Sequence, residues 1–291
     1  MESKILMFHS LDRMDWLCTI SNAFQNYSTT STQIRIVLRF APELKPYRIH
    51  PVHVASLACL IESFASRGFS VNVDRNSLLG EYFFTELNFR EYWAGGKNFV
   101  EAKEDSIFNL WRLKDCEKEI VPIRVCEYFK RGLFKRKDLA TVQLSLDEAF
   151  YNVFDHAEAN GNAFLFLRFN EERGVLSIAV CDFGRGIPST VKAYLPGIDS
   201  DVDALKLAIQ DSFTVKSQGH NKGFGLGNIR DAGVEGDSMW IVSNEASLVT
   251  LKGSVRGMHN EFFFPGTAIF YDLTLKSFED EEIIDNFEIT I

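Results

Sequence analysis

The sequence contains few cysteines, and their arrangement indicates neither a disulfide framework nor a zinc site. Its 291 residues include five cysteines, none of them in a C-x-x-C pair, and six histidines that are dispersed along the chain. Structural zinc sites need closely spaced ligands, and disulfide-rich domains need paired cysteines. An odd number of scattered thiols is typical of reduced cysteines, so we expect a cytoplasmic protein.

Long apolar runs are also missing from the sequence. No stretch reaches the roughly 18 apolar residues of a membrane-spanning helix. The first residues lack the basic start and apolar middle of a signal peptide, because Glu2, Asp12 and Asp15 interrupt them. The formal net charge is −9, which argues against a general footprint for nucleic acid or an acidic membrane. We therefore expect neither as a partner.

Apolar and aromatic residues, in contrast, are plentiful. Hydrophobic residues make up 46% of the chain and 26 residues are Phe, enough for a large core built around aromatic rings. The length suits two domains of ordinary size. We predict an α+β protein with a smaller α/β domain over residues 1–125 and a larger domain over residues 126–291.

The first half contains a strand–helix–strand pattern. Residues 34–42 alternate in polarity and end in proline, residues 50–68 carry the apolar face of a helix, and residues 69–74 form a second strand. Such a unit normally pairs its strands in parallel. The flanking patterns predict a short helix and a loop within residues 1–30, a helix over residues 83–93 and a strand over residues 106–113.

The second half has a sharper pattern. We predict one long helix over residues 139–161, stopped by Asn160-Gly161, and then a hairpin of two apolar strands. The hairpin strands cover residues 163–170 and 175–184. Further on, the pattern predicts a helix near residues 201–213, a glycine-rich loop that opens a helix, and strands over residues 238–244, 247–253 and 266–275.

Three polar residues share one stripe of the long predicted helix. Glu148, Asn152 and His156 are spaced four residues apart, which places them near one line on a helix surface. A Glu–Asn pair alone is more often a solvated face. Asn is a poor residue for a helix interior, however, and Glu beside Asn can hold hydrated Mg²⁺ and orient a water molecule.

A carboxylate and two glycines follow the second hairpin strand, in the segment DFGRGIP. Asp182 ends a very apolar strand, and Gly184 and Gly186 come directly after it. A buried acceptor at a strand end can accept a hydrogen bond from a flat amino group such as that of adenine. An ordinary Asp-Gly turn is about as common an explanation of this pattern when it stands alone.

The segment KGFGLGNI places glycine at every second position. It comprises Lys222, Gly223, Phe224, Gly225, Leu226 and Gly227, followed by Asn228 and Ile229. Repeated glycine at the start of a helix is suited to anions, because free N–H groups and the helix dipole point the same way. Many G-x-G-x-G loops bind no ligand, so the segment gains its meaning from the motifs around it.

The order of these motifs resembles the GHKL superfamily, the histidine kinase-like ATPases of the Bergerat fold. DEAFYNVFDHA is similar to its N box, DFGRGIP to its D-x-G-x-G box, and FTVKS followed by KGFGLGNI to the phenylalanine box, ATP lid and second glycine box of the kinase branch. GTAIF is similar to its final strand. The resemblance covers about residues 139–275 and implies that the larger domain is an α/β sandwich whose mixed sheet is covered by helices. Residues 30–120 resemble a STAS-like domain in the order of elements, although no serine stands at the start of the helix where that family carries its phosphoacceptor.

The resemblance implies ATP and Mg²⁺ as cofactors and a role for each residue. Glu148 would be the general base and Asn152 would hold Mg²⁺, whereas His156 would be structural. Asp182 would bind the adenine amino group with Thr267 nearby, and the glycines of both boxes would lie against the nucleotide. Lys222 or Lys216 would neutralise phosphate charge. These nucleotide-binding residues are Asn152, Asp182, Gly184, Gly186, Lys222, Gly223, Phe224, Gly225, Leu226, Gly227 and Thr267.

The resemblance leaves two classes of function open. The first is an ATPase with slow turnover or a serine/threonine protein kinase of the anti-sigma-factor type. The alternative is a non-catalytic switch that binds a partner protein when ATP or ADP closes the lid. Both imply a protein partner, and a homodimer is an open alternative because kinase-type relatives often dimerise. A sensor histidine kinase is disfavoured, because none of the histidines before residue 139 lies on a dimerising helix hairpin.

Overall fold

The computed structural model describes residues 2–27, 34–159, 161–210, 234–251 and 253–281, with no description of the side chains of Asp155 and His156. Within these ranges the chain is an α+β protein, as expected. Its strands are β1 (Glu2–Phe8), β2 (Ile34–Phe40), β3 (Ser70–Val73), β4 (Ile107–Arg112), β5 (Ala163–Asn170), β6 (Val175–Asp182), β7 (Ser238–Leu251) and β8 (Ser254–Thr274). Its α-helices are α1 (Arg13–Asn26), α2 (Pro51–Ser66), α3 (Leu78–Thr85), α4 (Phe89–Trp93), α5 (Ile120–Gly132), α6 (Ala140–Tyr151), α7 (Ile187–Tyr194) and α8 (Asp201–Ala208).

The strands form two separate sheets. The smaller sheet has the order β1-β2-β3 and is parallel, as the strand–helix–strand pattern predicts. The larger sheet has the order β4-β5-β6-β8-β7, and every described pairing in it is antiparallel. The expectation of a mixed sheet was wrong in this respect. The pairs β5–β6 and β7–β8 are consecutive in the sequence, and strands that follow each other so closely can pair only in antiparallel fashion.

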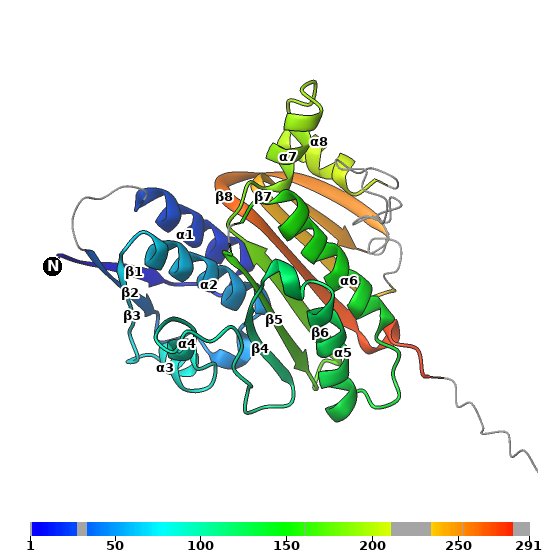
Figure 1. Ribbon diagram of the computed structural model, residues 1–291, viewed down its shortest axis with the longest axis horizontal. Coiled ribbons are helices and arrows are strands. Elements are labelled where there is room, and N and C mark those ends of the chain that lie inside the picture. Colours follow the sequence, from blue (N-terminus) through cyan, green and yellow to red (C-terminus); the bar gives the residue numbers. More distant parts are fainter. Residues whose placement is uncertain (1, 28–33, 160, 211–233, 252, 282–291) are drawn as a thin grey trace, which may run out of the picture.

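Helices α1 and α2 lie between the two sheets (Figure 1). Almost all of α2 is buried, because one side contacts the small sheet and the other packs on β5 and β6. A helix that is apolar all round needs such cover on every side. The opposite face of the large sheet packs against α5, α6, α7 and α8. The protein is thus layered as small sheet, helices, large sheet and helices.

Alternation along the strands assigns residues of the large sheet to its two faces. Phe164, Phe166 and Phe270 belong to the core that includes α1 and α2. Leu165, Ile178 and Val180, with their neighbours at every second position, belong to the core that includes α5 and α6. Because side chains of a strand alternate between faces, Asp182 and Thr267 project toward the α6 side.

Several predicted elements differ from the structure. Residues 2–8 form β1, a strand that the sequence reading missed because its apolar run pairs only with the distant β2. The helix expected over residues 83–93 is divided into α3 and α4 at Asn88, whose φ of 51° is left-handed. The two strands expected over residues 238–253 are one strand, β7, with an irregularity at Asn244.

The long helix expected over residues 139–161 also differs. The α-helical part α6 ends at Tyr151, and a π-helical turn, Asn152–His156, continues it. The Ala157 N–H donates to the Asn152 carbonyl, five residues back, at 3.1 Å. Such turns are rare, and they are frequent at functional sites.

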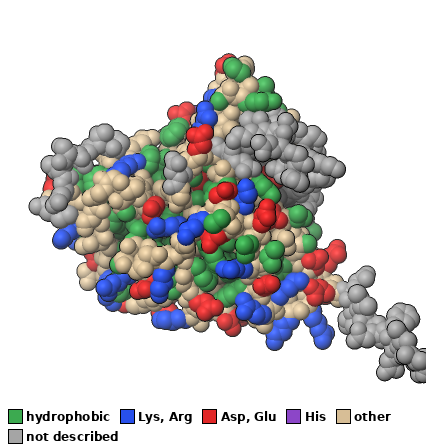
Figure 2. Space-filling view, in the orientation of Figure 1, with side chains coloured by type: hydrophobic (Ala, Val, Ile, Leu, Met, Phe, Trp, Pro, Cys, Tyr) green, Lys and Arg blue, Asp and Glu red, His purple; other side chains and the backbone are tan. Residues whose placement is uncertain are grey.

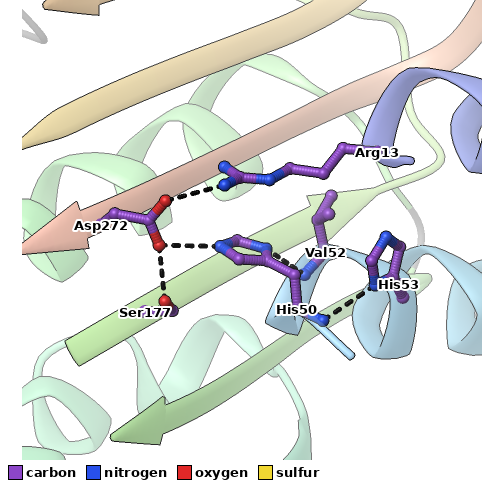
Figure 3. Close-up of polar contacts among 6 residues, drawn as sticks. All are labelled: Arg13, His50, Val52, His53, Ser177 and Asp272. Atoms are coloured by element: carbon purple, nitrogen blue, oxygen red, sulfur yellow. Dashed lines mark hydrogen bonds and ion pairs between the residues drawn. The ribbon is translucent and has the colours of Figure 1, made fainter. Parts of the chain in front are cut away.

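A polar cluster joins α1 and α2 to the large sheet on the face opposite α6 (Figure 3). Asp272 of β8 accepts hydrogen bonds from Arg13 at 3.0 Å, from His50 at 3.0 Å and from Ser177 at 2.5 Å. His50 Nδ1 accepts from the Val52 N–H, so the neutral ring carries its proton on Nε2 and donates it to Asp272. Burial raises the pKa of Asp272, but His50 and Arg13 outweigh it and hold this pKa below its usual value.

The expected division of the chain into two domains, between residues 125 and 126, stays a prediction. In the structure β4 lies before this boundary yet pairs with β5 after it. The core around α2 also includes residues from β5, β6 and β8. Among the described helices, none is both long and apolar enough to cross a membrane.

Candidate functional site

Glu148 and Asn152 lie one turn apart where α6 gives way to the π-helical turn. The Asn152 side-chain N–H₂ donates to the Glu148 carbonyl at 3.0 Å and to the Glu148 carboxylate at 3.4 Å. Asn152 Oδ1 accepts no hydrogen bond from the part of the chain that the structure describes. Both side chains are partly buried. The pair therefore offers an oriented amide oxygen beside a carboxylate, as the sequence spacing predicts.

Asp182 is the last residue of β6 and is only 2% exposed. Its Oδ1 accepts the Gly184 N–H at 2.9 Å, so the carboxylate closes the turn that follows the strand. It lies opposite Thr267 in the β6–β8 register. Burial raises the pKa of Asp182 to about 8. Hydrogen bonds from the backbone of Gly184 and Thr267 lower this pKa, but their effect is smaller than that of burial. A carboxylate so deprived of water gains from any ligand that donates a hydrogen bond to it.

The turn after Asp182 packs closely on the π-helical turn. The Arg185 N–H donates to the Ala157 carbonyl at 2.6 Å. A side chain at Gly184 would collide with the same carbonyl of Ala157, so glycine is required by this close approach. The contact brings two motifs that are about 30 residues apart in the sequence to one end of the large sheet.

Gly186 has the backbone conformation that glycine allows. Its φ is 81°, and a Cβ atom there would meet the side-chain amide of Asn244. Gly186 precedes α7 as its N-cap. Gly186, the second glycine of the motif, is therefore needed for the local turn. This agrees with a role in packing as well as with a role in the close approach of a ligand.

Ser243 and Asn244 of β7 hold this turn in place, and sequence reasoning missed both. Ser243 Oγ donates to the Gly266 carbonyl at 2.7 Å and accepts from the Ile187 N–H at 3.0 Å. Asn244 Oδ1 accepts from Ser189 N and Oγ at 3.2 and 2.8 Å. The first turn of α7 is thus already satisfied by protein groups. A polar Ser-Asn pair at the end of an apolar strand was the only available signal.

Thr267 lies beside Ser243 in the middle of this network. Its Oγ1 is 3.0 Å from Ser243 Oγ. Because the single Ser243 proton is directed at the Gly266 carbonyl, the Thr267 hydroxyl donates to Ser243 and keeps its own lone pairs available. Thr267 is 3% exposed. Asp182, at the end of β6, and Ser243 and Thr267, within β7 and β8, therefore form one buried polar group across three adjacent strands.

Glu148 interacts electrostatically with a residue of the large sheet. Burial, and next the negative charge of Glu148, raise the pKa of Tyr271 on β8 well above its usual value. Tyr271 projects from the same face as Thr267, which comes four residues before it on β8. Its hydroxyl is buried without a hydrogen-bond partner among the described residues. Glu148 and the buried polar group of Asp182, Ser243 and Thr267 thus lie on the same side of the large sheet.

The other candidate residues lie outside the described residues. They are Lys216, Lys222, Gly223, Phe224, Gly225, Leu226 and Gly227. The structure therefore bears on the expected positions of Glu148, Asn152, Asp182, Gly184, Gly186 and Thr267 alone. Of these, Asp182, Gly184 and Thr267 share contacts, and Glu148 and Asn152 are linked to them through Ala157.

The charges in the described part of the chain do not form a metal cluster. No three His, Cys, Asp or Glu side chains gather closely enough there to hold a metal ion. Mg²⁺ does not need such a cage, since it is commonly bound through one or two protein oxygens together with substrate phosphates. On the face shown in Figure 2, basic and acidic side chains are interspersed over α5 and α6.

The chain matches no protein-family model, and it matches no curated protein.

Proposed function

We propose that this protein binds ATP with Mg²⁺ where Asp182 ends β6 beside Thr267 of β8, close to Glu148 and Asn152. The observation that carries the proposal is the buried Asp182 carboxylate, whose pKa is raised to about 8 by loss of water. An adenine amino group would donate to it and replace that water. Together with the motif order, which is similar to GHKL proteins, this favours a nucleotide over other flat ligands.

The α6 pair fits the phosphate end of the same ligand. Asn152 Oδ1 is directed by the two hydrogen bonds that its N–H₂ group donates to Glu148. An amide oxygen is a suitable ligand for Mg²⁺, and the ion would supply charge stabilisation to the phosphates when bound. Glu148 would accept the proton of an attacking water or hydroxyl group. The proposed output is slow ATP hydrolysis, or phosphoryl transfer to a serine or threonine of a partner protein.

Calorimetric titration of ATP with Mg²⁺ tests the binding step. Asp182→Asn should weaken binding about tenfold or more, because a donated hydrogen bond favours the ionised form of Asp182 and the variant offers only an uncharged amide oxygen in its place. The matched control is Asp147→Asn, the same change next to Glu148. Asp147 is half-buried near Glu119, where burial and that charge raise its pKa to about 6. Equal losses in the two variants, or no binding by the unmodified chain, would overturn the proposal.

A second assay separates an enzyme from a switch. Glu148→Gln keeps the size of the side chain and removes the base. If the protein acts by phosphoryl transfer, release of γ-phosphate should fall about a hundredfold or more while ATP still binds. If the unmodified chain binds ATP and releases no phosphate, the alternative holds, in which nucleotide binding alters a surface for a partner protein.

A further inference from the structure

A pocket of about 470 Å³ lies beside β3, an edge strand of the small sheet. Its walls come from the C-terminal part of α2, from β3, and from α3 and α4 (Figure 1). The volume is within the range of small-molecule sites, which are about 300–1,000 Å³. No residue of the candidate nucleotide site contributes to it.

The lining of this pocket is mostly apolar and rich in rings. Its apolar surface includes Ile61, Val73 and the four aromatic residues Phe69, Phe84, Phe89 and Trp93. Phe89 and Trp93 are in contact, with ring centroids 5.6 Å apart. Flat faces and edges of this kind favour an aromatic or otherwise flat apolar body.

Arg90 supplies the charge of the pocket. It is exposed at the lining, and no described carboxylate forms an ion pair with it. The acidic side chains nearby are already occupied. Glu91 pairs with Lys97 at 3.0 Å, and Glu62 pairs with Arg112 at 2.7 Å. An arginine without a partner beside an apolar cavity matches the planar carboxylate of a ligand.

The remaining polar groups of the wall support the same orientation. Trp93 Nε1 donates to Glu62 at 2.9 Å, so the indole presents only its apolar surface to the cavity. Asn72 is exposed on β3, the outer strand of the small sheet. A ligand with its ring against Trp93 and Phe89 would therefore direct its polar end toward Arg90 and Asn72.

We propose that this pocket binds a small hydrophobic carboxylate, an aromatic or short-chain acid that carries one negative charge. Trp93 lies against Phe164 of β5, with ring centroids 6.2 Å apart. A bound acid would thus contact a residue that packs directly on the large sheet. The inference is independent of ATP binding, because every residue that lines the pocket lies in the first half of the chain.

The test is calorimetric titration with 1-naphthylacetate and with its uncharged analogue 1-naphthylacetamide. The acid should bind the full chain with a dissociation constant below about 1 mM, as expected for a ligand of this size. Arg90→Gln should weaken the acid about tenfold and leave the amide within about twofold. Arg35→Gln, an exposed arginine of β2 outside the pocket, is the matched control and should change neither.

A second variant tests the place of binding. Ala65 lines the pocket and is exposed, so Ala65→Trp should fill the cavity without disturbing the core and abolish binding of both compounds. The melting temperature of each variant, measured alongside, shows that it is folded. Equal affinity for the acid and the amide would overturn the proposal that Arg90 recognises the carboxylate of the ligand. Absence of binding, or binding unaffected by Ala65→Trp, would overturn the site.

Discussion

At the scale of single residues, Asp182 carries an energetic cost in the unliganded protein. Its folded-state pKa of about 8 lies above the usual 3.8. The folded state therefore binds this proton more tightly than the unfolded state. The stabilisation that this bound proton gives to the folded protein is complete at pH values below the pKa of Asp182 in the unfolded state. It is lost as the pH rises toward 8.

We therefore predict that Asp182→Asn stabilises the protein increasingly as the pH rises. Asn keeps an oxygen for the Gly184 N–H but has no proton to lose. Between pH 5 and pH 7 the advantage of the variant should grow by about 2 kcal/mol. Urea unfolding of both proteins at the two pH values, without nucleotide, measures it. A constant difference between them would show that Asp182 has an ordinary pKa.

The placement of a residue could be predicted from the sequence where its motif lies within one segment. The pairing of Glu148 with Asn152 follows from helical spacing, and the burial of Asp182 follows from the apolar strand before it. The roles of Ser243 and Asn244 were not predicted, because their partners are 23 to 59 residues away in the sequence. Nothing local distinguishes this Ser-Asn pair from the end of an ordinary strand.

At the scale of elements, most strands and helices could be predicted from periodicity. The errors occur where long-range contacts decide the structure. β1 exists because it pairs with β2, and the π-helical turn lies where Ala157 contacts the turn after Asp182. The glycines of that turn were predicted to admit a ligand. The structure adds that Gly184 is needed for contact with Ala157.

The cluster around Asp272 joins elements from both halves, and its loss should be costly. Asp272→Asn leaves Arg13 and His50 without their charged partner in a site where Asp272 is 18% exposed. We predict a loss of about 2–4 kcal/mol in the free energy of unfolding at pH 7. The measurement is urea unfolding followed by tryptophan fluorescence.

The control for this variant is Asp203→Asn. Asp203 pairs with Lys206 on α8 at 3.7 Å and its side chain is 67% exposed, so the change should cost less than about 0.5 kcal/mol. If both variants lost the same stability, the Asp272 cluster would contribute no more than a surface ion pair.

At the scale of the whole molecule, the two halves share one hydrophobic core. Phe164, Phe166, Phe264 and Phe270 of the large sheet are fully buried in the core that contains α1 and α2. A fragment of residues 126–291 would lack β4 and would expose this aromatic face. An apolar surface of that kind drives association.

We predict that this fragment forms no stable monomer. Size-exclusion chromatography should show aggregates, and thermal unfolding should lack the cooperative transition of the full chain. Addition of residues 1–125 should restore part of the soluble material, since it supplies both β4 and the covering helices. A monomeric fragment with its own cooperative transition would mean that the expected boundary divides two independent folding units.

The proposed adenine contact is tested most directly by comparing ATP with inosine triphosphate. The two nucleotides differ at one edge of the ring, where inosine carries a carbonyl oxygen in place of the amino group and a proton on the adjacent N1. If Asp182 accepts the hydrogen bond of that amino group, the full chain should bind ATP about tenfold or more tightly than inosine triphosphate in calorimetric titrations with Mg²⁺. Asp182→Asn should abolish or reverse this preference, because its amide can donate to the carbonyl. Equal affinity of the unmodified protein for both nucleotides would contradict the account.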